Sequence, residues 1–271
     1  MMSPSAVPPF RGNAGLASVV VPDPMIDVVI LAWNDGELLD HAVASALASV
    51  AVDPRVWIVD NGSDPPVPAP TDPRVRLLRN EHNAGVSGGR NQGVRVGTSG
   101  LVCLLDSDAR LEPGCLAALS AVLALRPDVA LTAPVFIDQA PEASAGRAPT
   151  VWMKVSRALN LRAKYEPVTE VDGTWDVDFA IGACQLFRRS AYDAVDGLDE
   201  RYFYGPEDVD FCLRLREAGF GIVQVRAARC EHPPRRRNKK LLTRRGLQHG
   251  VAVTRHLWRH RSFRRRVPAS S

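Results

Sequence analysis

Short runs of apolar, mostly β-branched residues alternate along the chain with stretches in which apolar residues recur at helical spacing. The runs predict buried parallel strands, and they cover residues 27–33, 56–60, 75–78, 101–105 and 129–133. Helical spacing follows the first run at residues 38–47, and residues 113–125 fit a helix with a proline in its first turn. Strands that alternate with helices indicate right-handed crossovers and a largely parallel sheet. The pattern therefore predicts an α/β fold.

The second half of the chain has a weaker pattern. Residues 138–174 are irregular and are predicted to form a variable loop with one helix near residues 151–163. A strand, a helix with acidic residues in its first turn and a short final strand are predicted at residues 176–187, 207–218 and 222–225. The expected organisation is a flexible leader, one α/β domain and a basic helical extension, over residues 1–24, 25–232 and 233–271.

The composition is typical of a cytosolic globular protein. The chain has 271 residues, of which 45% are hydrophobic and 24% charged, enough for a large buried core. Five scattered cysteines include no Cys-x-x-Cys pair, which favours reduced thiols. No run approaches the roughly 18 apolar residues of a membrane span, and the N-terminus has no apolar segment typical of a secretory signal. A cytoplasmic location is expected.

Charge is distributed unevenly along the chain. Residues 232–271 contain 13 Lys or Arg and no Asp or Glu, which leaves 21 of the 34 basic residues and all 30 acidic residues in the remainder, a formal charge of −9. Apolar residues interleave with the basic ones, so the tail is predicted to lie on an anionic membrane face or to pack its apolar stripe on the core. Nucleic-acid binding is disfavoured, because the body is acidic and no recognition signature is present.

Polar clusters follow three of the predicted strands. They are Asn34-Asp35, Asp60-Asn61 and Asp106-Ser107-Asp108. Because ligands of parallel sheets bind beyond the carboxyl ends of the strands, these clusters are expected to form a single site.

The third cluster is a candidate metal site. Asp106 and Asp108 stand two residues apart where a buried strand opens into a loop, so both carboxylates can face one hard cation. Mg²⁺ and Mn²⁺ take oxygen ligands and leave positions for phosphate oxygens, and such a cation stabilises a departing diphosphate. The alternative is a solvated acidic turn that caps the next helix.

Two further segments are candidates for ligand binding. Asp60 can accept a hydrogen bond from a base or a ribose hydroxyl, and its alternative is an ordinary Asx turn. Residues 80–93 contain four glycines and three asparagines, which favours a loop whose backbone amides approach a ligand; the alternative is a flexible connection. Arg90, within this segment, can pair with a phosphate or with a carboxylate of the site.

Glu207-Asp208 begins a predicted helix directly after the aromatic segment Tyr202-Phe203-Tyr204. A carboxylate near aromatic walls can have a raised pKa and act as a base toward an acceptor hydroxyl; the alternative is helix capping. His232 follows the final strand and is a candidate third metal ligand, with a structural histidine as the alternative.

Taken in order, these segments resemble the family 2 glycosyltransferases, which have the GT-A fold. The matching stretches are DVVILAWND, WIVDNGSD, RNEHNAGVSGGRNQGV, LLDSDA, GACQLFRRSAYDAVDGLDERYFYGPEDVDFCLRLREAG and the later Glu231-His232. They span most of the chain, and their arrangement is similar to that of rhamnosyltransferase-like enzymes of bacterial surface glycans. The resemblance implies an inverting transfer from a nucleoside diphosphate sugar, expected to be a UDP- or dTDP-sugar, to a glycan, lipid-linked or small-molecule acceptor.

The resemblance also implies roles by position. Asp208 matches the general base, and Glu207 is expected to contact the acceptor or hold the loop. Asp106, Asp108 and His232 are the expected ligands of Mg²⁺ or Mn²⁺. Donor binding is expected at Ala32, Asn34, Asp35, Asp60, Asn61, Asn83, Gly85, Arg90, Asn91, Asp106 and Ser107. Sugar or acceptor contacts are expected at Gly182, Ala183 and Cys184.

The predicted function is a metal-dependent glycosyltransferase of the cytoplasm, peripheral at the inner face of the membrane if the tail binds lipid, and active in cell-surface glycan or glycolipid synthesis. A catalytically silent sugar-nucleotide-binding protein is the alternative, and the intact Asp106, Asp108 and Asp208 argue against it.

Overall fold

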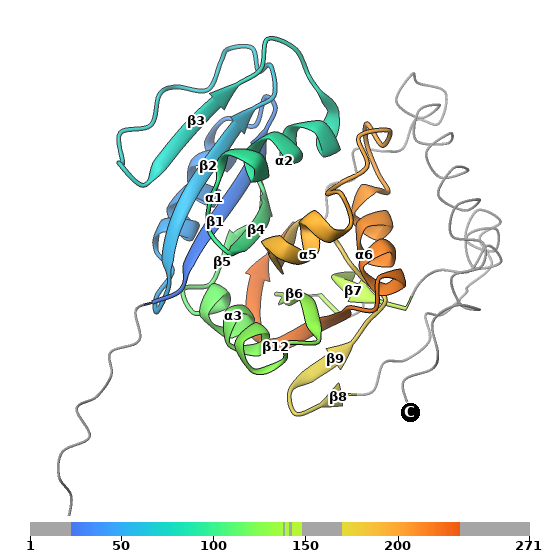
Figure 1. The fold of residues 1–271 in the computed structure, drawn as a ribbon. Coiled ribbons are helices and arrows are strands. Elements are labelled where there is room, and N and C mark those ends of the chain that lie inside the picture. The colour runs from blue at the N-terminus through green and yellow to red at the C-terminus, as the bar shows by residue number, and fades with distance from the viewer. Residues whose placement is uncertain (1–22, 138, 141–142, 148–169, 234–271) are drawn as a thin grey trace, which may run out of the picture.

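A computed structural model describes residues 23–137, 139–140, 143–147 and 170–233 (Figure 1). The predicted helix near residues 151–163, the predicted basic extension and nearly all of the predicted leader lie outside these residues. Within them, ten strands form one sheet in the order β3-β2-β1-β4-β11-β6-β12-β9-β8, with β5 paired to β12. The strands are β1 Met25–Ala32, β2 Asp53–Asp60, β3 Val75–Arg79, β4 Leu101–Asp106, β5 Arg110–Leu111, β6 Val129–Phe136, β8 Glu170–Val171, β9 Thr174–Asp176, β11 Cys184–Arg188 and β12 Gly221–Glu231.

The sheet has a parallel half and a mixed half. β3, β2, β1 and β4 run parallel, as the sequence predicted for the runs that form them. β11 then runs antiparallel between β4 and β6, whereas β6 and β12 are parallel to each other. A second, small sheet pairs β7 (Ala145–Gly146) with β10 (Phe179–Ala180). The predicted α/β fold with a mostly parallel sheet is therefore confirmed.

Helices cover both faces of the sheet. They are α1 Glu37–Leu47, α2 Gly85–Val96, α3 Cys115–Leu125, α5 Arg189–Ala194 and α6 Glu207–Glu217. Alternate residues of β1 point to opposite faces: Val28 and Ile30 share a buried cluster with α1 and α3. Val29 belongs to a second cluster with residues of α2, α5 and α6. Burial of these two apolar layers is the main force that holds the helices on the sheet.

Two predicted elements need correction. The strand predicted over residues 176–187 is divided among β9, β10 and β11, because the three segments pair with β12, β7 and β4 respectively. The helix predicted to begin at Pro113 begins at Cys115, so the proline precedes the first turn. All five cysteines are buried and unpaired, as expected for reduced thiols.

The glycine-rich segment predicted as a ligand loop is mostly a helix, α2. Its glycines serve close packing of helix on sheet. A Cβ at Gly89 would lie 2.3 Å from Leu31 Cδ1, and a Cβ at Gly93 would lie 2.3 Å from Val29 Cγ1. The composition that favours a loop in isolation therefore reflects the short distance between α2 and strands β1 and β2.

Substitution of Gly93 tests this packing. Alanine is the better helix former, yet Gly93→Ala is expected to lower the free energy of unfolding by about 1–3 kcal/mol, because overpacking against a stiff valine forces α2 away from the sheet. Gly88→Ala is the matched control in the same helix, since a Cβ there would meet only Ala84 Cβ at 3.4 Å. Urea titration of both variants checks this, and equal effects at the two positions would contradict it.

Candidate active site

A cavity of about 410 Å³ opens at the carboxyl ends of the parallel strands. The predicted site residues that line it are Asp35, Asn61, Asn83, Gly85, Arg90, Asp106, Ser107, Asp108, Gly182, Ala183, Glu207, Asp208 and His232. The three polar clusters expected to converge do so, because Asp35 follows β1, Asn61 follows β2 and Asp106 ends β4.

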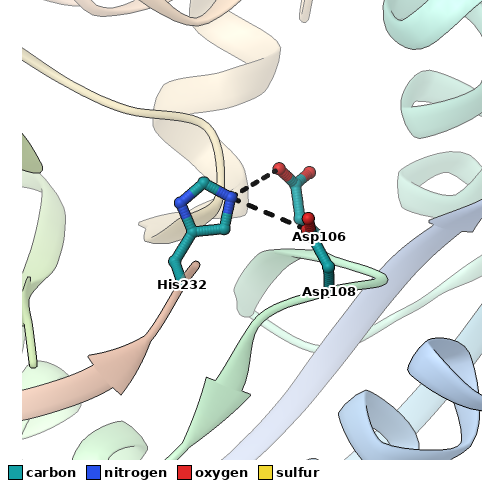
Figure 2. A group of neighbouring side chains, drawn as sticks. All are labelled: Asp106, Asp108 and His232. Carbon is teal, nitrogen blue, oxygen red and sulfur yellow. Dashed lines mark ion pairs between the residues drawn. The ribbon is translucent and has the colours of Figure 1, made fainter. Parts of the chain in front are cut away.

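Asp106, Asp108 and His232, which line the cavity, form a group of potential metal ligands (Figure 2). One ligand atom from each residue lies within 4.8 Å of those of the other two. His232 Nε2 is 3.8 Å from Asp106 Oδ2 and 3.6 Å from Asp108 Oδ1. His232 is placed by β12, which ends at Glu231, and its ring lies against Phe136 with the centroids 5.1 Å apart. The two carboxylates offer the oxygen donors that Mn²⁺ and Mg²⁺ prefer, and the imidazole adds one nitrogen donor.

A hydrogen-bond network fixes the loop beside this group. Ser107 Oγ donates to Asp35 Oδ2 at 2.6 Å, and the backbone N–H of Trp33 donates to the same oxygen at 2.9 Å. The backbone N–H of Asp106 donates to the carbonyl of Ala183 at 2.9 Å. The loops after β1 and β4 are therefore held to each other and to the start of β11.

Arg90 is buried at the centre of the site. Its Nη2 donates to Asp106 Oδ1 at 2.6 Å and to the carbonyl of Gly182 at 2.9 Å, and its Nη1 lies 3.4 Å from Glu207 Oε1. Burial lowers the pKa of Arg90, but the charges of Asp106, Glu207 and Asp208 outweigh it, so the pKa is raised. Of the two sequence interpretations, the structure shows pairing with carboxylates.

The backbone N–H and carbonyl groups of Gly182 connect Arg90 to Asp208 through hydrogen bonds. Its carbonyl accepts from Arg90, and its N–H donates to Asp208 Oδ2 at 2.9 Å. A Cβ at this position would lie 2.7 Å from Arg90 Nη1 and 3.1 Å from Asp208 Cβ, so a side chain there would require Arg90 and Asp208 to shift. Asp106, Arg90, Gly182 and Asp208 are thus linked by an unbroken chain of hydrogen bonds across the cavity.

Glu207 is the most strongly perturbed acid of the site. Burial, followed by the charge of Asp208, raises its pKa to about 7, although Arg90 opposes the shift. Its Oε2 is buried and has no hydrogen-bond partner among the described residues. A carboxylate of this kind holds a proton near neutral pH.

Five predicted residues lie outside the cavity lining: Ala32, Asn34, Asp60, Asn91 and Cys184. Asp60 is fully buried, and its carboxylate accepts from the backbone N–H groups of Ser63 and Val67 at 2.9 and 3.0 Å. Asn34 accepts from the backbone of Asp64 at 2.8 Å. These contacts shape the loop after β2, as in the Asx-turn alternative. Direct contact of either residue with a donor stays a prediction.

The other three of these residues are buried in the fold. Ala32 lies in the core. Asn91 Nδ2 donates to the carbonyl of Leu198 at 2.8 Å, which ties α2 to the segment before the cavity's aromatic residues. Cys184 contacts the thiols of Cys103, Cys115 and Cys230, and these contacts with burial raise its pKa. Their predicted ligand contacts also stay predictions.

The cavity wall includes three aromatic residues outside the predicted set of site residues, two of which belong to the aromatic walls expected beside the paired acids. They are Trp33, Phe203 and Tyr204. The signal for Trp33 is its place directly between a buried strand and a polar cluster. The signal for the other two is an aromatic segment immediately before the paired acids.

Comparison with protein families gives one match that covers most of the chain. A family model described as "Glycosyltransferase like family 2" matches residues 22–248.

Curated relatives include bacterial transferases. The N-acetylglucosaminyl-diphospho-decaprenol L-rhamnosyltransferase of Mycobacterium tuberculosis is 28% identical over 241 residues, which cover 77% of this chain and 76% of that protein. The pre-mycofactocin glycosyltransferase of the same species is 30% identical over 233 residues; the match covers 84% of this chain but only 47% of that protein.

Solved structures share the fold at low sequence identity. GalNAc-T7 with UDP, GalNAc and Mn²⁺ superposes with a TM-score of 0.67 at 16% identity, over 87% of this chain and 48% of that chain. The mannosyltransferase PcManGT from Pyrobaculum calidifontis, in complex with GDP-Man and Mn²⁺, gives a TM-score of 0.61 at 16% identity, over 89% and 66% of the two chains.

Proposed function

Because this chain belongs to glycosyltransferase family 2 and has the GT-A fold, we propose that it transfers a sugar from a nucleoside diphosphate sugar to an acceptor hydroxyl, with inversion at the sugar carbon and with Mn²⁺ or Mg²⁺ bound. One observation carries the proposal. The potential metal ligands Asp106, Asp108 and His232 line the same cavity as the paired acids Glu207 and Asp208.

The proposal assigns roles to several residues of the cavity. Asp106, Asp108 and His232 would hold the metal ion, which would supply positive charge to stabilise the departing diphosphate. Asp35, Asn61 and Ser107 bind the nucleoside at the strand ends. Asp208 takes the proton of the acceptor hydroxyl, and its position is fixed by the N–H of Gly182. A fixed base and a bound donor in one cavity give the orientation that an in-line displacement needs.

The substrates are proposed from the relatives. Similarity to a rhamnosyltransferase, expected from the sequence, is confirmed at 28% identity, and it supports transfer of a sugar. We propose a UDP- or dTDP-sugar as the donor. The structural neighbours were solved with UDP or GDP-Man and Mn²⁺. The named acceptor of the rhamnosyltransferase is a lipid-linked sugar, which supports a role in bacterial glycan or glycolipid synthesis for this chain.

The cellular location is proposed on fewer observations than the reaction. The part of the chain that the structure describes contains no helix both long and apolar enough to cross a bilayer. We propose a cytoplasmic enzyme that works at the inner face of the membrane, where a lipid-linked acceptor is presented. Lipid contact is assigned to the basic tail, whose residues lie outside the described ranges.

A thermal-shift panel tests the proposal. UDP, dTDP and GDP are added to the full chain with Mn²⁺ or with EDTA. A nucleotide at about 100 times its Kd stabilises the folded state by about 2.7 kcal/mol, so at least one nucleotide is expected to raise the Tm by about 5 °C or more with Mn²⁺, and much less with EDTA.

Asp108→Asn is expected to remove the Mn²⁺ dependence, because an amide is a weaker ligand for a hard cation. Asp193→Asn, the same change at an exposed position on α5, is the control and should keep the full response. A metal-dependent shift that survives Asp108→Asn, or no shift with any nucleotide, would contradict the proposal.

A further inference from the structure

Two aromatic side chains stand exposed at the cavity. Phe203 is 40% exposed and Tyr204 is 45% exposed, although both line the cavity that holds the paired acids. The exposed large hydrophobic residues of the described part of the chain are Met25, Val50, Val96, Leu125, Val171, Phe203 and Tyr204. Only the last two line the cavity. Exposed apolar surface at a cavity rather than scattered singly indicates a binding surface.

The backbone that carries these rings is fixed. Tyr202 is fully buried and its hydroxyl donates to Asp210 Oδ1 at 3.2 Å. The carbonyl of Tyr202 accepts from Ser87 Oγ at 2.8 Å, and the carbonyl of Phe203 accepts from the N–H of Val86 at 2.8 Å. The first turn of α2 therefore holds the segment in place, and only its side chains remain exposed.

Gly85 gives the Phe203 ring its place. This residue has φ +79°, and a Cβ there would lie 2.8 Å from Phe203 Cδ2 and 2.9 Å from the Phe203 carbonyl oxygen. The absent side chain lets the ring rest against the start of α2. An aromatic ring on a fixed backbone loses little conformational entropy when a ligand covers it.

We propose that Phe203 and Tyr204 form the wall on which the acceptor's sugar ring stacks, so that the acceptor of this enzyme is a saccharide. The inference rests on the proposed function and specifies its acceptor. A pyranose has a face of C–H groups and a rim of hydroxyls. Phe203 and Tyr204 cover the C–H face by apolar burial and dispersion, whereas Glu207 and Asp208 accept hydrogen bonds from the hydroxyls.

The chain order strengthens this assignment. Phe203 and Tyr204 precede Glu207 by only a few residues, and both segments line the same cavity. The wall therefore adjoins the proposed base in the chain. Phe203 also lies beside Gly85, whose carbonyl accepts from Asn61 Nδ2 at 3.1 Å, so the wall reaches the residues proposed for the nucleoside as well. A simple alcohol has no flat C–H face to match such a wall.

Saturation-transfer NMR tests the inference on the full chain with Mn²⁺ and the nucleotide that gives the largest thermal shift. The probes are methyl α-L-rhamnoside, methyl β-D-glucoside and methyl N-acetyl-β-D-glucosaminide, with cyclohexanol as a ring without the sugar hydroxyls. At least one glycoside is expected to receive saturation at its ring C–H protons, and cyclohexanol less. Phe203→Ala should weaken that glycoside about tenfold, in the range found for buried aromatic contacts, whereas Phe203→Tyr should restore binding.

A control variant and the nucleotide thermal shift distinguish the possible failures. Leu125→Ala removes an exposed apolar side chain that does not line the cavity, and it should leave glycoside binding unchanged. If the nucleotide shift persists but no glycoside depends on Phe203, the saccharide wall is wrong and the proposed transferase stands. If Phe203→Ala abolishes the nucleotide shift, the ring serves the donor and the inference is again wrong. If the wild-type chain shows no nucleotide shift, the proposed function fails first.

Discussion

Asp208→Asn is expected to reduce the rate of sugar transfer by roughly 10²–10⁴-fold, the usual contribution of a general base. The amide oxygen of asparagine can still accept from the N–H of Gly182, which Asp208 accepts at 2.9 Å, so the local geometry should be kept. What the variant lacks is the negative charge that takes the proton of the acceptor hydroxyl. Binding of the donor nucleotide should therefore change little.

The measurement is transfer from the donor identified by the nucleotide panel, with the Mn²⁺-dependent thermal shift recorded on the same preparation. Glu217→Gln is the matched control, since Glu217 is an exposed acid at the other end of α6 and outside the cavity. Its transfer rate should equal that of the wild type. Turnover of Asp208→Asn within about threefold of the wild type would remove Asp208 from the role of base.

Arg90→Met is expected to lower the free energy of unfolding by about 3 kcal/mol, because it leaves the carboxylates around a buried arginine without their positive charge. Asp106 is partly exposed and Glu207 is not, so most of the cost is expected at Glu207. At roughly 2–4 °C per kcal/mol for a chain of this size, the Tm should fall by about 6–12 °C. Arg95→Met in the same helix is the control, since its pair with Glu200 is exposed on both sides and contributes little.

The effect of Arg90→Met should depend on pH. The pKa of Glu207 is about 7 in the folded protein against 4.5 without burial, so the folded state holds a proton that the unfolded chain has lost between about pH 4.5 and 7. Stability therefore declines as the pH rises through that window. Because Arg90 opposes the shift, its loss should enlarge the decline. Urea titrations should show a larger deficit at pH 8 than at pH 5, and an equal deficit at both would argue against Glu207 as the main source.

The parallel half of the fold could be predicted from the sequence because each of its strands is a self-contained apolar run. The helix α2 could not be predicted, because glycines are poor helix formers. Its glycines are needed because the helix lies very close to Leu31 and Val29 of β1, which the local sequence does not show. Residues 176–187 look like one strand because most of them are apolar. Their division depends on three different partners, which no local pattern contains.

The sequence predicted which potential metal ligands lie together better than it predicted which site residues are buried. Asp106 and His232 are far apart in the chain, yet motif order was enough to place them together, and their ligand atoms meet within 4.8 Å. The sequence did not show which of the polar site residues are buried. Asp60 is fully buried, and its carboxylate accepts from the backbone N–H groups of Ser63 and Val67, whereas its expected contact with a donor stays a prediction. The sequence allowed Arg90 to pair with a phosphate or with a carboxylate of the site. Its pairing with Asp106 and Glu207 is visible only in the structure.

The direction of β11 has a consequence for how specificity can vary. Because β11 is antiparallel to β4, the start of β11 lies beside the end of β4, and Cys184 pairs with Leu105. The residues that enter β11, Gly182 and Ala183, therefore reach the cavity before the chain joins the sheet. A replacement at Ala183, which belongs to no strand, can reshape this side of the cavity without a change in strand pairing, whereas a replacement at Asp106, the end of β4, alters the proposed metal ligands.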